Sequence, residues 1–119
     1  MLLIEDETAV RNLVVRFLCA KGYQVFPAAD GDEALALWNL HKSQIDLVLA
    51  DIVMACGKSS RAMVNQFRTE HPELKVLFTS GYNVEEPGAD ANASHFLPKP
   101  YRPDQLLSAV REAIGGHGH

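Results

Sequence analysis

The sequence predicts a doubly wound α/β fold, in which a five-stranded parallel sheet carries helices on both of its faces. Short apolar runs alternate with segments of helical spacing along the whole chain, which is the pattern of repeated β-α units. The chain has 119 residues, of which 47% are hydrophobic and 22% charged, and this is ordinary for one compact globular domain. We therefore expect a single domain.

The first strand is expected at residues 2–4, an apolar run typical of a strand that is buried on both faces. From Thr8 onward apolar residues recur at helical spacing, and a helix there should end before Gly22. Residues 25–26 predict a second strand. Pro27 must end this strand or place it at a sheet edge, because proline has no amide hydrogen for an inner ladder.

The middle of the chain predicts a turn, a helix and the clearest of the strands. Residues 30–31 read as a turn, and apolar residues between 34 and 38 mark the second helix. The run at 45–50 is apolar except for one acid, and it predicts a buried strand that ends at Asp51.

The second half of the chain repeats the alternation. A helix is expected at about 60–70, strands at 76–78 and 95–97, and a last helix after Pro103. Residues 83–94 are acidic, small and interrupted by proline and glycine, so any helix there should be short or frayed.

The strand order expected for five such units is 2-1-3-4-5, the flavodoxin-like arrangement. The domain should occupy residues 1–115, and the glycine-rich segment 116–119 should form a flexible tail.

Composition excludes several classes of function. No apolar run approaches the roughly 18 residues of a membrane-spanning helix, so no membrane contact and a cytoplasmic location are expected. The net charge of −4 and the scattered basic residues argue against direct nucleic-acid binding. Cys19 and Cys56 have no paired spacing and should be free thiols.

Polar residues follow four of the predicted strands at the same end. They are Glu5 and Asp6 after the first strand, Asp51 after the third, Ser80 after the fourth and Lys99 after the fifth. The carboxyl ends of neighbouring parallel strands meet in one crevice, so three carboxylates should meet there. Because like charges repel, a hard divalent cation such as Mg²⁺ should bind among them and leave coordination positions for phosphate oxygens. With a lysine and a hydroxyl beside it, Asp51 has the surroundings of an aspartyl-phosphate site.

Spaced motifs across essentially the whole chain closely resemble response-regulator receiver domains, which have the CheY-like form of this fold. The motifs are Leu-Leu-Ile-Glu-Asp-Glu at 2–7, Ala-Asp-Gly-Asp-Glu-Ala-Leu at 29–35, Asp-Leu-Val-Leu-Ala-Asp-Ile-Val-Met at 46–54, Leu-Phe-Thr-Ser-Gly-Tyr at 77–82 and Phe-Leu-Pro-Lys-Pro-Tyr at 96–101. The last two are similar to receivers at the carboxyl end of hybrid sensor histidine kinases. A stand-alone regulator and an excised domain of such a kinase both fit the residues.

The resemblance implies a role for each residue of the metal site. Asp51 is the phosphoacceptor, and Glu5 and Asp6 form the acidic pocket. Mg²⁺ is held by Asp6, Asp51 and the backbone carbonyl of Val53, while Glu5 acts through water.

The resemblance also implies how the signal leaves the site. Lys99 binds the phosphoryl group, Ser80 is the switch hydroxyl and Phe96 the switch aromatic. Phosphorylation would remodel the face formed by segment 83–94, the last strand and the last helix, where a downstream protein binds. The donor is a histidine kinase or a histidine phosphotransfer domain. Monomer and homodimer both remain open.

The chain departs from the family pattern after Met54, where Ala55 and Ser59 stand in place of the usual proline and glycine. Val53 has no polar side chain to orient a hydrolytic water, so we expect slow autodephosphorylation. The domain is expected to catalyse only its own phosphorylation and not to act as an enzyme on a metabolite.

Two other functions share features with this sequence. A haloacid-dehalogenase-type phosphatase also uses an aspartate nucleophile and Mg²⁺, but it needs a second acid two residues later, where this chain has Val53. A receiver-like binding module that acts without phosphorylation is opposed by the complete set of site residues, and the altered loop after Met54 keeps it open.

Overall fold

The fold is a parallel β-sheet between two layers of helices, seen in a computed structural model that describes residues 1–52, 60–80, 95–98 and 101–115. The helix expected within 83–94, the tail at 116–119 and Cys56 lie outside the described residues. The strands are β1 (Leu2–Ile4), β2 (Phe26–Ala28), β3 (Leu47–Asp51), β4 (Lys75–Ser80) and β5 (His95–Pro98). The helices are α1 (Thr8–Ala20), α2 (Gly31–His41), α3 (Arg61–Glu70) and α4 (Pro103–Gly115), with a 3₁₀ turn at Lys42–Gln44.

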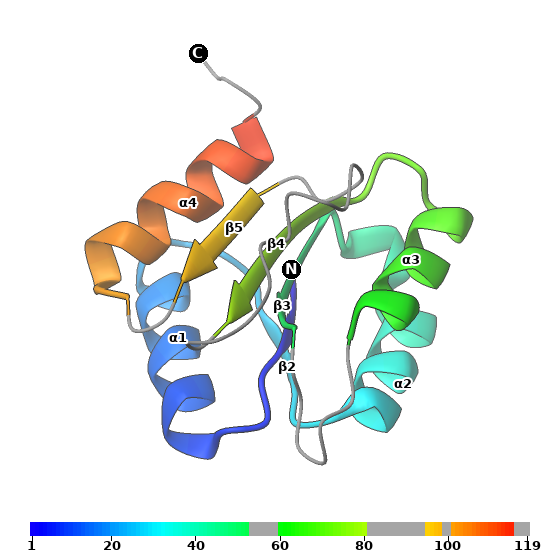
Figure 1. Cartoon of the computed structure of the whole chain (residues 1–119), viewed down its shortest axis with the longest axis horizontal. Coiled ribbons are helices and arrows are strands. Elements are labelled where there is room, and N and C mark those ends of the chain that lie inside the picture. The colour runs from blue at the N-terminus through cyan, green and yellow to red at the C-terminus, as the bar shows by residue number, and fades with distance from the viewer. Residues whose placement is uncertain (53–59, 81–94, 99–100, 116–119) are drawn as a thin grey trace.

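The five strands run parallel in the order β2-β1-β3-β4-β5, which confirms the predicted topology (Figure 1). β1 and β3 are neighbours at the centre, with Ile4 opposite Ala50. β3 and β4 pair over five residues, from Leu47 opposite Lys75 to Asp51 opposite Thr79. The strand order reverses between β1 and β3, so the crevice expected of such a sheet lies at their carboxyl ends.

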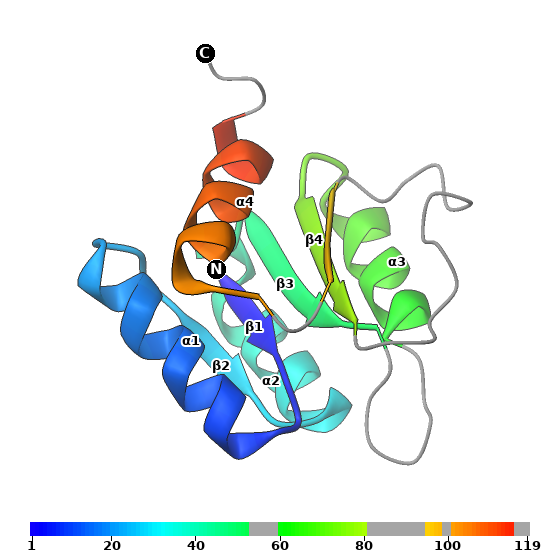
Figure 2. The ribbon, with the colours of Figure 1, turned by 60° about the vertical axis from the view of Figure 1, so that its left-hand side comes forward.

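Two hydrophobic cores lie on opposite faces of the sheet because side chains alternate along each strand. Leu2 and Ile4 of β1 join a core beneath α2 and α3 that contains Trp38 and Phe67. Leu3 faces the other way, into the core beneath α1 and α4. Figure 2 shows these two pairs of helices on either side of the strands.

The edge position expected for the second strand is confirmed, but its bounds differ from the prediction. Val25 lies outside the strand, and Pro27 lies within it, opposite Leu3. An edge strand tolerates proline because it needs amide donors on one side only. Phe26 supplies such a donor, since its N–H binds the carbonyl of Met1 at 2.8 Å.

The ends of other elements follow local hydrogen bonds. α1 stops at Ala20, and Gly22 has φ 93°, a left-handed conformation in which glycine carries no steric cost. The N–H groups of Gly22 and Tyr23 donate to the carbonyls of Cys19 and Leu18, as in a Schellman motif. β3 starts at Leu47 rather than at residue 45, because the 3₁₀ turn extends the preceding helix.

Within the described ranges, no helix combines the length and the apolar character needed to cross a bilayer. The thiol of Cys19 is free and exposed.

Candidate functional site

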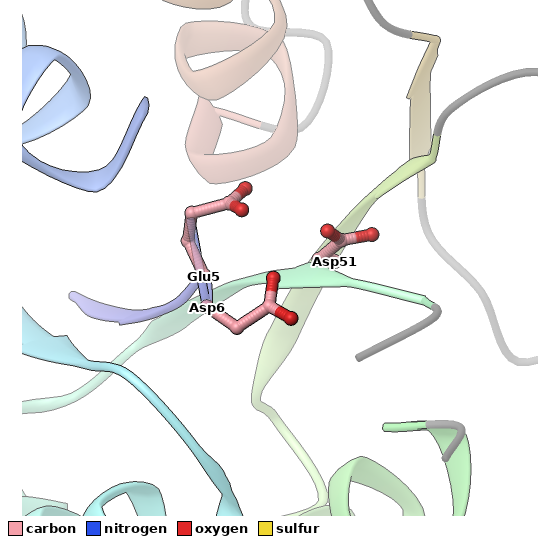
Figure 3. A group of neighbouring side chains, drawn as sticks. All are labelled: Glu5, Asp6 and Asp51. Atoms are coloured by element: carbon pink, nitrogen blue, oxygen red, sulfur yellow. The ribbon is translucent and has the colours of Figure 1, made fainter. Parts of the chain in front are cut away.

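Three carboxylates meet at the carboxyl ends of β1 and β3, as the sequence predicted. Ile4 and Ala50 are paired, so the residues that follow them in the two strands, Glu5 and Asp51, lie side by side at this edge of the sheet. In Figure 3 the side chains of Glu5 and Asp6 extend toward Asp51. One carboxylate oxygen from each of these residues lies within 4.8 Å of the other two.

The cluster is mostly buried. Glu5 is 2% exposed, Asp51 is 7% exposed and Asp6 is half-buried. Oxygen atoms at this spacing match the ligands of a hard divalent cation, which also removes the repulsion between them. Within the described residues, Asp6 is the carboxylate of the three that is most exposed to solvent.

Local hydrogen bonds hold Glu5 at the junction of β1 and α1. Its N–H donates to the carbonyl of Ala28 at 3.0 Å, which extends the contact with the edge strand. Its Oε2 accepts the N–H of Glu7 at 3.1 Å, and its carbonyl accepts the Arg11 guanidinium at 2.9 Å. The backbone and the carboxylate are therefore both anchored where the chain turns from the strand into the helix.

Asp51 is the last residue of β3, and its backbone lies close to β4 and to the start of α3. Thr79, 2% exposed, lies opposite it in β4, and the N–H of Ile52 donates to the Thr79 carbonyl at 2.8 Å. The hydroxyl of Ser60 donates to the carbonyl of Asp51 at 2.7 Å. Sequence reasoning did not single out Ser60, because a serine directly before a helix is the ordinary signal of an N-cap.

The other predicted site residues are placed only in part. Ser80 is the last residue of β4, opposite Pro98 of β5, at the same edge of the sheet as Asp51. Its side chain, together with Val53 and Lys99, lies outside the described residues. Phe96 lies in β5 and is 37% exposed.

Comparisons with known proteins agree with this architecture. The model of the response regulator receiver domain family matches residues 1–111. The sensor kinase CckA of Brucella abortus (strain 2308) is 38% identical over 118 residues, which cover 96% of this chain and 12% of the kinase. The response regulator MprA of Mycobacterium sp. (strain KMS) is 34% identical over 96% of this chain and 50% of its own length.

A solved structure extends the likeness to three dimensions. The crystal structure of the receiver domain from the hybrid histidine kinase CckA has a TM-score of 0.78 and 33% identity, and the match covers 95% of this chain and 96% of that domain. The chain thus spans a small part of one curated relative, half of another and nearly all of an isolated receiver. It belongs to the response regulator receiver domain family, which acts in two-component signalling.

Proposed function

We propose that Asp51 accepts a phosphoryl group from a histidine kinase or a histidine phosphotransfer domain, in a reaction that depends on Mg²⁺. The observation that carries the proposal is the convergence of three carboxylates within 4.8 Å at the carboxyl ends of β1 and β3. Like charges at this distance repel one another, and a divalent cation bound among them removes that repulsion. A binding site for a cation and a phosphoryl group accounts for their position.

The donor set fits Mg²⁺. Asp6 and Asp51 would supply direct carboxylate ligands, the backbone carbonyl of Val53 would add a third oxygen, and Glu5 would act through a coordinated water. The bound ion would neutralise the carboxylates and the developing charge on the phosphoryl oxygens.

Asp51 is the nucleophile in this scheme. One of its carboxylate oxygens attacks the phosphorus of the phosphohistidine in line with the phosphorus–nitrogen bond. That bond breaks, its electron pair returns to the imidazole, and an acyl phosphate forms on Asp51. The rigid carboxyl end of β3 contributes by holding the nucleophile in one orientation.

Three residues bind the product and transmit its formation. Lys99 pairs with a phosphoryl oxygen, and the Ser80 hydroxyl moves to donate a hydrogen bond to another. Phe96 then turns, and the face formed by residues 83–94, β5 and α4 changes shape for a downstream partner. The side chain of Phe96 is exposed on β5, and this supports the proposal because a partner could contact it there.

The relatives of the domain support a proposal for its setting. We infer a cytoplasmic receiver that acts within or beside a hybrid sensor kinase, supported by the 38% identity with CckA and by the structural match to the receiver of a hybrid histidine kinase. Its own chemistry is limited to phosphorylation and dephosphorylation of Asp51.

The test is incubation with Mg²⁺ and acetyl phosphate, followed by intact mass. Wild type should gain one phosphoryl group, and Asp51→Asn should gain none. Asp46→Asn is the matched control, because Asp46 is an exposed aspartate just before the other end of β3. Amide spectra with beryllofluoride should shift near Ser80 and Phe96 in wild type and in the control.

A receiver-like module that binds its partner without phosphorylation gives the opposite result. It would bind Mg²⁺ at the carboxylates, gain no mass and show no beryllofluoride shift at β5. Equal labelling of Asp51→Asn and wild type would place the phosphoryl group on another residue.

A further inference from the structure

Ser60 stands at the amino end of α3, yet its hydroxyl does not serve that helix. A serine at this position ordinarily accepts a hydrogen bond from an N–H group of the first turn. Here the side chain makes no capping hydrogen bond, and the residue has φ −82° and ψ −6°. Its hydroxyl donates to the carbonyl oxygen of Asp51 at 2.7 Å, and the residue is 1% exposed.

A second hydrogen bond joins Ser60 to the same stretch of backbone. Its N–H donates to the carbonyl of Ile52 at 2.9 Å, while the N–H of Ile52 donates to Thr79 in β4 at 2.8 Å. The start of α3 thus holds two consecutive peptide groups, those that follow Asp51 and Ile52. β4 holds the Ile52 N–H from the other side.

These bonds lie where the sheet alone gives less support. The pairing of β1 with β3 ends at Ile4 and Ala50, so Asp51 lies one residue beyond that ladder. The orientation of its peptide group sets the direction of the Cα–Cβ bond, and therefore the position of the carboxylate. Ser60 restrains that peptide group through a buried hydrogen bond of near-ideal length.

We propose that Ser60 is a positioning residue for Asp51, fixing the backbone from which the nucleophile attacks. This inference rests on the proposed phosphoryl transfer to Asp51. Ser60 would touch neither the phosphoryl group nor the metal, because its hydroxyl is used on the Asp51 carbonyl. Its effect is on alignment, to which in-line transfer is sensitive: a misplacement of about 1 Å can slow an enzymatic reaction about a hundredfold.

The test compares phosphorylation rates of Ser60→Ala and wild type over a range of acetyl phosphate concentrations at saturating Mg²⁺. Alanine removes a single atom and leaves the rest of the side chain in place. The maximal rate should fall about tenfold, within the range that misalignment allows. The half-saturating concentration of acetyl phosphate should stay the same, because the hydroxyl contacts no donor atom.

Two further variants separate alignment from stability. Thr69→Ala is the matched control, since it also loses a hydroxyl bond to a backbone carbonyl of α3, at 3.0 Å to Asn65, on an exposed part of the helix. Its labelling rate should equal that of wild type. Ser60→Thr keeps the hydroxyl and should restore most of the rate. Circular dichroism at the assay temperature verifies that each variant is folded.

The outcomes are distinct. A labelled wild type with an equally fast Ser60→Ala would overturn the positioning role and leave the phosphoacceptor role intact. A folded Ser60→Thr as slow as Ser60→Ala would also overturn it, because the hydroxyl would not be the cause. An unlabelled wild type would overturn both proposals. If Ser60→Ala or Ser60→Thr does not fold, Ser60→Cys has nearly the size of serine and a weaker donor. It should give an intermediate rate, and a wild-type rate would overturn the proposal.

Discussion

Asp51→Asn should stabilise the domain in the absence of divalent cations, although it removes the proposed phosphoacceptor. The reason is the mutual repulsion of three carboxylates whose oxygens lie within 4.8 Å of one another. Asparagine has nearly the same shape as aspartate and no charge, so the substitution removes two of the three repulsive pairs. The fold around β3 should otherwise remain as it is.

The size of the effect follows from Coulomb's law. At 4.8 Å, the upper limit of the distances between these oxygens, two unit charges repel by about 0.9 kcal/mol in water and by about 3.5 kcal/mol at an effective dielectric constant of about 20. Asp6 is half-exposed, and solvent screens its charge, so the lower limit is the better guide. We expect a gain of about 1–2 kcal/mol in the free energy of unfolding. For 119 residues this is about 4–8 °C in Tm.

The assay is thermal unfolding of wild type and Asp51→Asn in EDTA and in increasing Mg²⁺. A ligand that binds only the folded protein stabilises it by about 2.7 kcal/mol at 100 times its Kd. Wild type should gain from Mg²⁺ more than the variant does, because the variant lacks one carboxylate ligand. The difference in Tm seen in EDTA should therefore shrink or reverse.

Asp46→Asn is again the control, and it should leave both the Tm in EDTA and the response to Mg²⁺ near those of wild type. The reasoning fails if Asp51→Asn unfolds at a lower temperature than wild type in EDTA. It also fails if the two proteins gain equally from Mg²⁺, since Asp51 would then contribute nothing to the binding of the cation.

Three further predictions concern other parts of the molecule. The phosphorylated wild type should lose its phosphoryl group slowly, and Val53→Asn should speed the loss because asparagine can orient the attacking water. Intact mass measures the loss over time, and a wild type that loses the group within seconds would contradict this prediction. Hydrogen bonds from Trp38 and then from Lys42 lower the pKa of Glu70 from its usual 4.5, so its contribution to stability is present above that pH and is lost as the pH falls below it. Urea unfolding should show less loss of stability at acid pH for Glu70→Gln, and an identical pH profile would refute the assignment. Leu106→Ala shortens a fully buried side chain of α4 and should cost about 2–5 kcal/mol in the same assay, whereas a cost below about 1 kcal/mol would mean that the core closes around it.

The topology and the carboxylate cluster were predictable because both depend on regular patterns. Apolar runs mark buried strands, and residues that follow neighbouring parallel strands must lie together, which is why Glu5 and Asp51 were found from sequence alone. The exact bounds of the strands were harder to predict from the sequence. β4 runs from Lys75 to Ser80, beyond its apolar centre, because its partner β3 continues the ladder past the hydrophobic residues.

Contacts between distant side chains could not be read from the sequence. The indole N–H of Trp38 donates to Glu70 at 3.0 Å across 32 positions, and the Trp38 ring stacks on Phe67. From the sequence, Trp38 was only one of the apolar residues that mark the second helix. Ser60 shows the same limit. A serine before a helix predicts a cap, and the sequence does not indicate that its hydroxyl will instead donate to a distant carbonyl.

The sheet separates two hydrophobic cores, and each core packs against its own pair of helices. Side chains beneath α2 and α3 belong to one cluster and those beneath α1 and α4 to the other, with the strand backbones between them. Pairs of substitutions placed one in each half should have additive effects on stability, because they share no packing partner. Substitutions can therefore repack the α2–α3 core and change the stability of the domain while the packing beneath α1 and α4 stays as it is.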